Sequence, residues 1–208
     1  MGNEQHPSTS VLLDTLVSTD MPTPWATFKL LSFDLGEVGR EHFALVLGDV
    51  AHVEPVLCRI HSECLTGEAL HSLRCDCGPQ LDLALQKIAE SGCGVLIYLR
   101  QEGRGIGLRN KIRAYALQDK GMDTIEANEA LGLGVDLRNF DVAGLMLKTL
   151  GVGTVKLMTN NPDKLSCLAQ HGIAIAERIP LKIEANPFNQ AYLSTKARRL
   201  GHFLNDET

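Results

Sequence analysis

Apolar residues recur along this chain first with the spacing of strands and then with the spacing of helices. Three short runs, punctuated by glycine and proline, have the composition of β-strands: residues 25–35, 41–50 and 54–63. In the second run Phe43, Leu45 and Leu47 alternate with other residues, which is the period of a half-buried strand. The pattern therefore predicts strands paired in hairpins at the start of the fold.

From residue 81 onward, helical and strand-like patterns alternate. Leu81, Leu85 and Ile88 share one helical face, and Gly92 follows as a stop signal. The alternation predicts one α/β domain, a mixed β-sheet flanked by helices with antiparallel strands at its N-terminal side. The expected elements are strands at 94–100, 155–159 and 173–179, and helices at 108–120, 140–150, 162–170 and 189–204.

The first 20 residues are polar and lack periodicity, so we expect residues 1–20 to be a flexible tail and 21–208 a single folded domain. The first lysine or arginine is Lys29, so no cationic segment precedes an apolar stretch as in a secretory signal. The longest apolar run is about five residues, far short of the roughly 20 that span a bilayer. We therefore expect a cytoplasmic protein with no membrane contact.

Composition narrows the function class. The 208 residues include 44% apolar and 22% charged residues, as in an ordinary globular protein. The net charge of −5 disfavours general nucleic-acid binding, because a polyanion would be repelled. Six cysteines are too few for a disulfide-stapled fold, and in a reducing compartment they are expected to be free thiols or metal ligands.

Cys64, Cys75 and Cys77 form a C-x10-C-x-C arrangement that favours a zinc site. Three thiolates without a fourth partner suit a catalytic zinc, which keeps one position open. The alternative is three unrelated buried thiols, but the charged neighbours Arg74 and Asp76 argue against a core strand. The other three cysteines lie in apolar contexts and are expected in the core: Cys58, Cys93 and Cys167.

His61-Ser62-Glu63 stands directly before Cys64 and gives an H-x-E pattern. In zinc deaminases that act on nucleobases, such a histidine binds metal and the glutamate moves protons. That signature also needs P-C-x-x-C, which is missing here, so the match is weak. It makes hydrolytic attack on a base carbon a plausible chemistry.

Residues 100–113 combine three glycines with five cations, Arg100, Arg104, Arg109, Lys111 and Arg113. Glycines before a helix N-terminus let backbone N–H groups approach a phosphate. On an acidic protein this local excess of positive charge predicts a small polyanionic ligand. The alternative is a flexible turn that leads into a solvated basic helix face.

Two further loops carry polar residues. Asp136 and Arg138 lie in a glycine-flanked loop before a helix, a pairing that is also common on protein surfaces. Thr159, Asn160 and Lys164 lie at a strand-to-helix turn. Strand ends of α/β sheets are preferred ligand positions, and from there Lys164 could reach a phosphate.

Taken together, the segments RIHSECLTGEAL, SLRCDCGPQL, YLRQEGRGIGLRNKIRAYALQDKG, DTIEAN and LMTNNPDK resemble the GTP cyclohydrolase II family, over residues 22–204. The resemblance implies an enzyme that opens the imidazole ring of GTP at the start of riboflavin synthesis. It would release C8 as formate, lose pyrophosphate and leave a diamino-ribosylamino-pyrimidinone 5′-phosphate. The resemblance further implies Zn²⁺ for the ring, Mg²⁺ with the triphosphate, and a homodimer.

The resemblance also assigns residues. It implies Asp136 as a proton acceptor, Arg138 as a nucleophile at the α-phosphate, and Tyr115 near the ring chemistry. A guanidinium has no lone pair to offer, so without strong deprotonation by Asp136 it is better suited to clamping phosphate charge, and both roles stay open. The implied zinc ligands are Cys64, Cys75 and Cys77, and the implied GTP contacts are Arg59, Ile60, His61, Ser62, Glu63, Gln80, Glu102, Gly103, Arg104, Thr124, Thr159 and Lys164.

Two other functions remain open at this point. One is a related cyclohydrolase that stops at a formylated product, and the other is a non-catalytic nucleotide-binding regulator. Separate assays of formate and pyrophosphate distinguish all three. Relatives often carry a second domain before this one; only about 20 polar residues precede the match here, so we expect that second activity to be missing.

Overall fold

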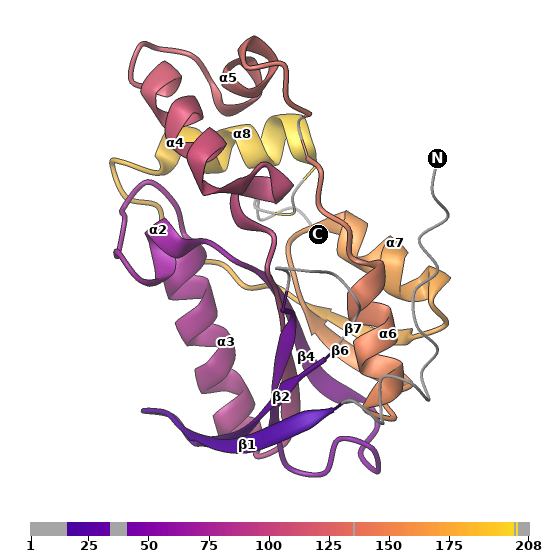
Figure 1. Ribbon diagram of the computed structural model, residues 1–208. Coiled ribbons are helices and arrows are strands. Elements are labelled where there is room, and N and C mark those ends of the chain that lie inside the picture. Colours follow the sequence, from indigo (N-terminus) through magenta and orange to yellow (C-terminus); the bar gives the residue numbers. More distant parts are fainter. Residues whose placement is uncertain (1–15, 34–40, 135, 202, 204–208) are drawn as a thin grey trace.

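A seven-stranded mixed sheet forms the centre of the fold (Figure 1). The computed structural model describes residues 16–33, 41–134, 136–201 and 203. Within them the strands follow the order β1-β2-β3-β5-β4-β6-β7. Their bounds are β1 Val17–Pro22, β2 Thr27–Ser32, β3 Phe43–Leu47, β4 Val56–Ser62, β5 Gly94–Leu99, β6 Thr154–Met158 and β7 Ala174–Ile179.

The strand directions divide the sheet into two halves. β1, β2, β3 and β5 pair antiparallel in that order, whereas β4 runs parallel to β5 and β6, and β7 runs parallel to β6. The predicted fold class, a mixed sheet with antiparallel strands at its N-terminal side, is confirmed. Parallel strands require crossover connections, and the helices after β4, β5 and β6 supply them.

The first strand begins inside the segment that we expected to be a tail. Residues 17–20 belong to β1, which pairs with β2 along its whole length. All six residues of β1 are exposed, so this edge strand has no apolar face that a sequence pattern could reveal. Residues 1–15 of the expected tail lie outside the described residues.

Seven α-helices and one short 3₁₀ helix accompany the sheet within the described residues. Each longer helix expected from the sequence is present, although α3 begins four residues before Leu81. Two short helices, α2 and α5, were not expected. The bounds are α2 Leu65–Glu68, α3 Cys77–Ser91, η1 Glu102–Gly105, α4 Gly107–Gln118, α5 Thr124–Ala130, α6 Asp141–Thr149, α7 Pro162–Gln170 and α8 Gln190–Leu200.

Helices cover both faces of the sheet. Alternate residues of β5 point to opposite sides: Val95 and Ile97 pack with α6 and α7, whereas Leu96 packs with Ile88 of α3. All four side chains are fully buried. Burial of such a side chain contributes about 1.5–3 kcal/mol, so the two cores fix the orientation of the parallel strands. None of the described helices is long and apolar enough to cross a membrane.

The remaining helices gather at one end of the sheet. Figure 1 shows α4, α5 and α8 together there, beyond the ends of the strands. The carboxyl ends of β4, β5 and β6 meet at that edge, which is where ligands bind in open α/β sheets.

Candidate active site

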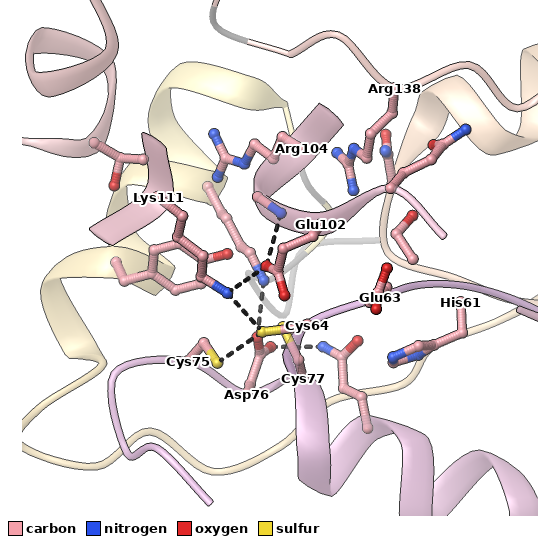
Figure 2. Close-up of a pocket in the computed structure, with 18 of the residues that line it drawn as sticks. His61, Glu63, Cys64, Cys75, Asp76, Cys77, Glu102, Arg104, Lys111 and Arg138 are labelled. Atoms are coloured by element: carbon pink, nitrogen blue, oxygen red, sulfur yellow. Dashed lines mark hydrogen bonds and ion pairs between the residues drawn. The ribbon is translucent and has the colours of Figure 1, made fainter. Parts of the chain in front are cut away.

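One pocket lies at this edge, and Figure 2 shows side chains from several distant segments facing into it. Lining residues between positions 59 and 64 come from the end of β4 and the residues that follow it, and those between 101 and 106 come from the turn after β5. Those between 159 and 164 come from the turn after β6 and the first turn of α7. Helices α4, α5 and α8 contribute further side chains. The pocket is therefore assembled from parts of the chain that are up to about 140 residues apart.

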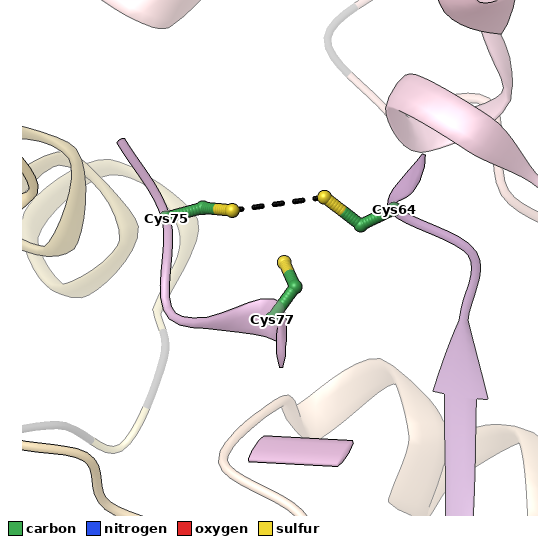
Figure 3. A group of neighbouring side chains, drawn as sticks. All are labelled: Cys64, Cys75 and Cys77. Carbon is green, nitrogen blue, oxygen red and sulfur yellow. Dashed lines mark hydrogen bonds between the residues drawn. The ribbon is translucent and has the colours of Figure 1, made fainter. Parts of the chain in front are cut away.

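Cys64, Cys75 and Cys77 converge on this pocket (Figure 3). All three sulfur atoms lie within 4.8 Å of one another, and the Sγ atoms of Cys64 and Cys75 are 3.6 Å apart. A tetrahedral zinc with Zn–S bonds of about 2.3 Å places its sulfur ligands about 3.8 Å from each other. The three free thiols thus have the spacing and the donor chemistry of a zinc site with one side open to the pocket.

Gly67 allows the cysteines to come together. A Cβ atom at this position would lie 2.7 Å from Sγ of Cys75 and 3.3 Å from Sγ of Cys64. Both distances are shorter than an ordinary carbon–sulfur contact, so any side chain here would push the sulfurs apart.

Glu68 fixes the backbone next to the cysteine group. Its Oε1 atom accepts hydrogen bonds from the backbone N–H of Cys64, at 2.7 Å, and from Nε2 of His61, at 2.9 Å, and its other oxygen accepts from the Tyr98 hydroxyl. Burial lowers the pKa of His61, so its ring is neutral. His61 lies outside the group of converging sulfurs. The H-x-E pattern therefore does not form the metal arrangement of the deaminases.

Lys111 balances charge beside the thiols. Its ammonium donates to Sγ of Cys64 at 3.1 Å and to Oε1 of Glu102 at 2.7 Å. Burial by itself would lower the pKa of Lys111, but Cys64 and Glu102 together raise it, so the lysine stays charged. Hydrogen bonds from the Cys75 and Cys77 thiols, together with the Lys111 charge, lower the pKa of Cys64. The site thus favours the thiolate at Cys64, the form that a metal needs, whereas hydrogen bonding to Cys64 raises the pKa of Cys75 and Cys77.

Positive charge dominates the pocket as a whole. Its lining includes three acidic residues, Glu63, Asp76 and Glu102, against twice as many lysines and arginines. The cations come from six different segments of the chain: Arg59, Arg104, Lys111, Arg138, Lys164 and Lys196.

Two of these cations are deeply buried close to each other. Arg59 and Lys164 are each about 5% exposed, and Lys164 donates to the backbone oxygen of Ile60 at 2.8 Å. Burial, followed by repulsion from Arg59 and Arg138, lowers the pKa of Lys164 well below its usual value. Burial lowers the pKa of Arg59 to about 10. Such crowding of cations is costly in an isolated protein and is relieved by a bound anion.

Several polar atoms of the lining also lack hydrogen-bond partners within the described part of the chain. Each buried polar atom without a partner costs about 1–3 kcal/mol, so their concentration here indicates a polar ligand. The lining atoms are Nε of Arg59, Nδ1 of His61, Oγ of Ser62, Oε1 of Gln101, both terminal guanidinium nitrogens of Arg104 and Nδ2 of Asn161.

The glycine-rich loop positions Arg104. Gly103 and Arg104 both have a φ near +60°, a conformation that costs a non-glycine residue of order 1 kcal/mol. Gly105 has no room for a side chain, because a Cβ atom would lie 3.0 Å from the backbone of Leu137. The Leu137 N–H in turn donates to the Arg104 carbonyl at 2.9 Å. The glycines thus join this loop to the one that carries Arg138.

The pocket brings together the predicted site residues with two exceptions. The side chain of Ile60 points into the hydrophobic core, and its backbone carbonyl accepts a hydrogen bond from Lys164. Asp136 is outside the lining and pairs with Arg138. The predicted residues that line the pocket are Arg59, His61, Ser62, Glu63, Cys64, Cys75, Cys77, Gln80, Glu102, Gly103, Arg104, Tyr115, Thr124, Arg138, Thr159 and Lys164.

The five cations of residues 100–113 do not act as one cluster. Only Arg104 and Lys111 line the pocket, whereas Arg100, Arg109 and Arg113 are exposed. Arg100 pairs with Glu63 at 3.2 Å. A helix turns by about 100° per residue, so residues two positions from Lys111 on α4 face away from the site. The predicted excess of positive charge is real, but most of it comes from other segments.

The contribution of α8 to the pocket was not predicted from the sequence. Tyr192 and Lys196 line the pocket from this helix, and Asn128 does so from α5. The sequence signal for α5 was available, because Asp123 and Glu126 form a capping box around its first turn. No comparable local signal identifies Lys196.

A second group of potential metal ligands lies outside the pocket, between α6 and α7. Asp141 accepts a hydrogen bond from Nε2 of His171 at 3.0 Å, and its distance to Sγ of Cys167 is 3.5 Å. Gly144 leaves room for the His171 ring, which a Cβ atom would approach to 2.5 Å. These contacts hold the two helices together.

Comparison with known proteins identifies the family of this chain. Residues 14–180 match the family model of GTP cyclohydrolase II. A GTP cyclohydrolase-2 of Aeromonas hydrophila is 59% identical over 191 residues, which is 91% of this chain and 97% of that protein. The corresponding protein of Shewanella sp. (strain W3-18-1) is 55% identical, and the match covers 92% of this chain and 94% of that protein. That of Haemophilus influenzae is also 55% identical, and the match covers 94% of this chain and 92% of that protein.

A solved structure shows a more distant likeness. It is RibBX from A. baumannii, a two-domain 3,4-dihydroxy-2-butanone 4-phosphate synthase, with a TM-score of 0.42 and 17% identity. The match covers 85% of this chain and 44% of that one. The family assignment rests on the sequence matches, which extend over nearly the whole chain: this protein belongs to the GTP cyclohydrolase II family.

Proposed function

We propose that this enzyme hydrolyses the imidazole ring of GTP with a zinc ion held by Cys64, Cys75 and Cys77, and that it releases formate and pyrophosphate. One observation supports the proposal above others: a three-thiol group and six cations line the same pocket. The thiols supply the ligands for a catalytic metal, and the cations suit a triphosphate. A ligand that carries both a hydrolysable ring and phosphates is what this combination would accept.

The cations would bind the phosphates. The charge of Arg138 lowers the pKa of both Arg59 and Lys164, so these three cations lie close together, and the guanidinium of Arg104 has two unpartnered nitrogens. Charge-assisted hydrogen bonds from such groups are about twice as strong as neutral ones. We propose that the triphosphate enters with Mg²⁺ and occupies this side of the pocket.

The residues around the thiols would orient the ring. Zinc bound there would act as a Lewis acid and make a water molecule acidic enough to attack at neutral pH. Burial raises the pKa of Tyr115 to about 12, so its hydroxyl remains a hydrogen-bond donor next to the reaction. Glu102 keeps Lys111 in place and also accepts from the backbone of Leu65 at 2.6 Å. These contacts hold the segment that begins with Cys64.

The experiment is a product assay. The zinc-loaded protein is incubated with GTP and Mg²⁺, and formate and pyrophosphate are measured separately. The proposal predicts one formate and one pyrophosphate per GTP consumed. Ring opening without formate would instead show a cyclohydrolase that stops at a formylated product, and binding of GTP without consumption would show a regulator.

A further inference from the structure

Helix α8 lies beyond the part of the chain that matches the family model, which ends at residue 180. It nevertheless contributes Tyr192 and Lys196 to the pocket lining. In Figure 1 this helix lies at the same end of the sheet as α4 and α5, where the pocket is.

Lys196 makes a buried ion pair with Asp76. Its ammonium lies 2.8 Å from Oδ1 of Asp76, and the two side chains are 12% and 2% exposed. Asp76 stands between Cys75 and Cys77, so the pair ties α8 to the segment that carries two of the three thiols. The Lys196 ammonium also lies 4.5 Å from the centre of the Tyr192 ring.

The ion pair is the first link of a chain of hydrogen bonds. Oδ2 of Asp76 accepts from Nε2 of Gln80 at 2.5 Å, and Oε1 of Gln80 accepts from Arg59 at 2.7 Å. The same guanidinium donates to the Met158 carbonyl at 2.9 Å. Both ends of the Gln80 amide are therefore assigned, because a flipped amide would face Asp76 with its oxygen and Arg59 with its nitrogen.

We propose that Lys196 is a positioning residue of the active site. By holding Asp76, it sets the orientation of the Gln80 amide and of the Arg59 guanidinium for nucleotide binding. This inference rests on the proposed function. A competing interpretation is that the pair only attaches α8 to the rest of the fold, since breaking any buried ion pair is destabilising.

The test uses full-length, zinc-loaded enzyme and the variant Lys196→Met. We expect the KM for GTP and the Kd of a non-hydrolysable GTP analogue to rise about tenfold or more, while kcat falls less. Zinc content should stay at one per chain. Lys196→Arg keeps the charge and should bring both constants back to within about threefold of wild type.

Arg199→Met is the matched control. Arg199 is on the same helix and pairs with Asp123, but it does not line the pocket. If the ion pairs of α8 only attach this helix to the rest of the fold, Lys196→Met and Arg199→Met will change KM equally. We expect Arg199→Met to stay within about twofold of wild type, because exposed ion pairs contribute little.

A double-mutant cycle separates the two interpretations. If Lys196 acts through Gln80, then Lys196→Met changes the Kd of the analogue much less in a Gln80→Ala background than in the wild type. Additive effects, or a Lys196→Met variant within twofold of wild type, would overturn the proposal. If Lys196→Met does not fold, the cycle is run with Lys196→Gln. The cycle measures analogue binding, so it remains informative even if wild-type enzyme fails to release formate, an outcome that would refute only the proposed function.

Discussion

The guanidinium of Arg138 is held by the carboxylate of Asp136, two residues earlier in the chain. Nε of Arg138 lies 2.9 Å from Oδ1 and 3.1 Å from Oδ2 of Asp136, and a terminal nitrogen also donates to Oδ2. Burial alone would lower the pKa of Arg138, but the bonds to Asp136 raise it above its usual value. Burial alone would raise the pKa of Asp136, but the contacts with Arg138 outweigh burial and lower it below its usual value. The pair therefore stays fully charged at neutral pH, which favours Arg138 as a clamp for phosphate charge over a nucleophile.

Replacing Arg138 tests this role. Arg138→Lys keeps the charge but loses the bidentate geometry, so we expect pyrophosphate release to slow by about 10²-fold. Arg109→Lys is the control, because Arg109 is exposed and outside the pocket lining, and it should stay within about twofold. Stopped assays of pyrophosphate give both rates.

The pH profile of the same step separates clamp from nucleophile. If Arg138 is a clamp, its charge does not change between about pH 7 and 9, because its pKa is raised. Arg138 then adds no pH dependence to the rate of pyrophosphate release in this range. A neutral arginine that attacked phosphorus would become more abundant as the pH rises. A tenfold increase per pH unit that disappears in Arg138→Lys would therefore contradict the clamp.

Substrate binding should take up protons at Lys164. Its pKa in the free enzyme is lowered by burial and by the charges of Arg59 and Arg138, and a bound triphosphate favours the charged form. As the pH rises through that lowered pKa, the free enzyme loses this charge, so KM for GTP should rise. Titration calorimetry in buffers of different ionisation enthalpy should show uptake of up to about one proton per chain. Lys164→Arg stays charged and should abolish the uptake; unchanged uptake in that variant would refute the assignment.

Gly67 should be necessary for the geometry of the cysteine group. In Gly67→Ala the new Cβ would lie 2.7 Å from Sγ of Cys75, so the sulfurs must move apart. We expect zinc affinity to fall by about tenfold or more, as when groups that orient metal ligands are replaced, measured by competition with a chelator. An alanine variant with wild-type zinc affinity would show that the three sulfurs do not need their observed spacing.

Glu68 should contribute to stability through the contacts that it makes next to Cys64. Glu68→Ala removes the acceptor for the Cys64 backbone, His61 and Tyr98, and we expect the free energy of unfolding to fall by about 2–4 kcal/mol. Glu90→Ala is a control, because Glu90 accepts one exposed bond from Gln86, and a change within about 0.5 kcal/mol is expected. Urea denaturation measures both; similar values for the two variants would contradict the account.

Local patterns predicted most of the fold. The alternation in β3, the buried run of β5 and the cap at Asn161, whose side chain accepts from the Asp163 N–H at 3.0 Å, were all visible in the sequence. β1 was not, because an exposed edge strand is held by backbone hydrogen bonds to β2 and buries no alternating face. Periodicity reports burial, so elements without burial escape it.

The site was predictable in part, for a related reason. Cys64, Cys75 and Cys77 stand close in sequence, so their spacing alone was enough to predict a metal site. The Lys196–Asp76 pair joins residues 120 positions apart. Arg59 and Lys164 are also distant in sequence, yet they lie close enough for the charge of Arg59 to lower the pKa of Lys164, so only the tertiary structure brings these charges together. The run at 100–113 shows the converse: five neighbouring cations predict one site, but the turn of α4 directs Arg109 and Arg113 to solvent.

The most direct test of the account is a zinc titration of stripped enzyme. Protein freed of metal with a chelator is returned to GTP and Mg²⁺ with increasing Zn²⁺, and formate is measured at each step. The account predicts no formate without zinc and a rate that rises until about one zinc is bound per chain, and no recovery in Cys75→Ser. Formate release at the full rate by zinc-free enzyme would contradict it.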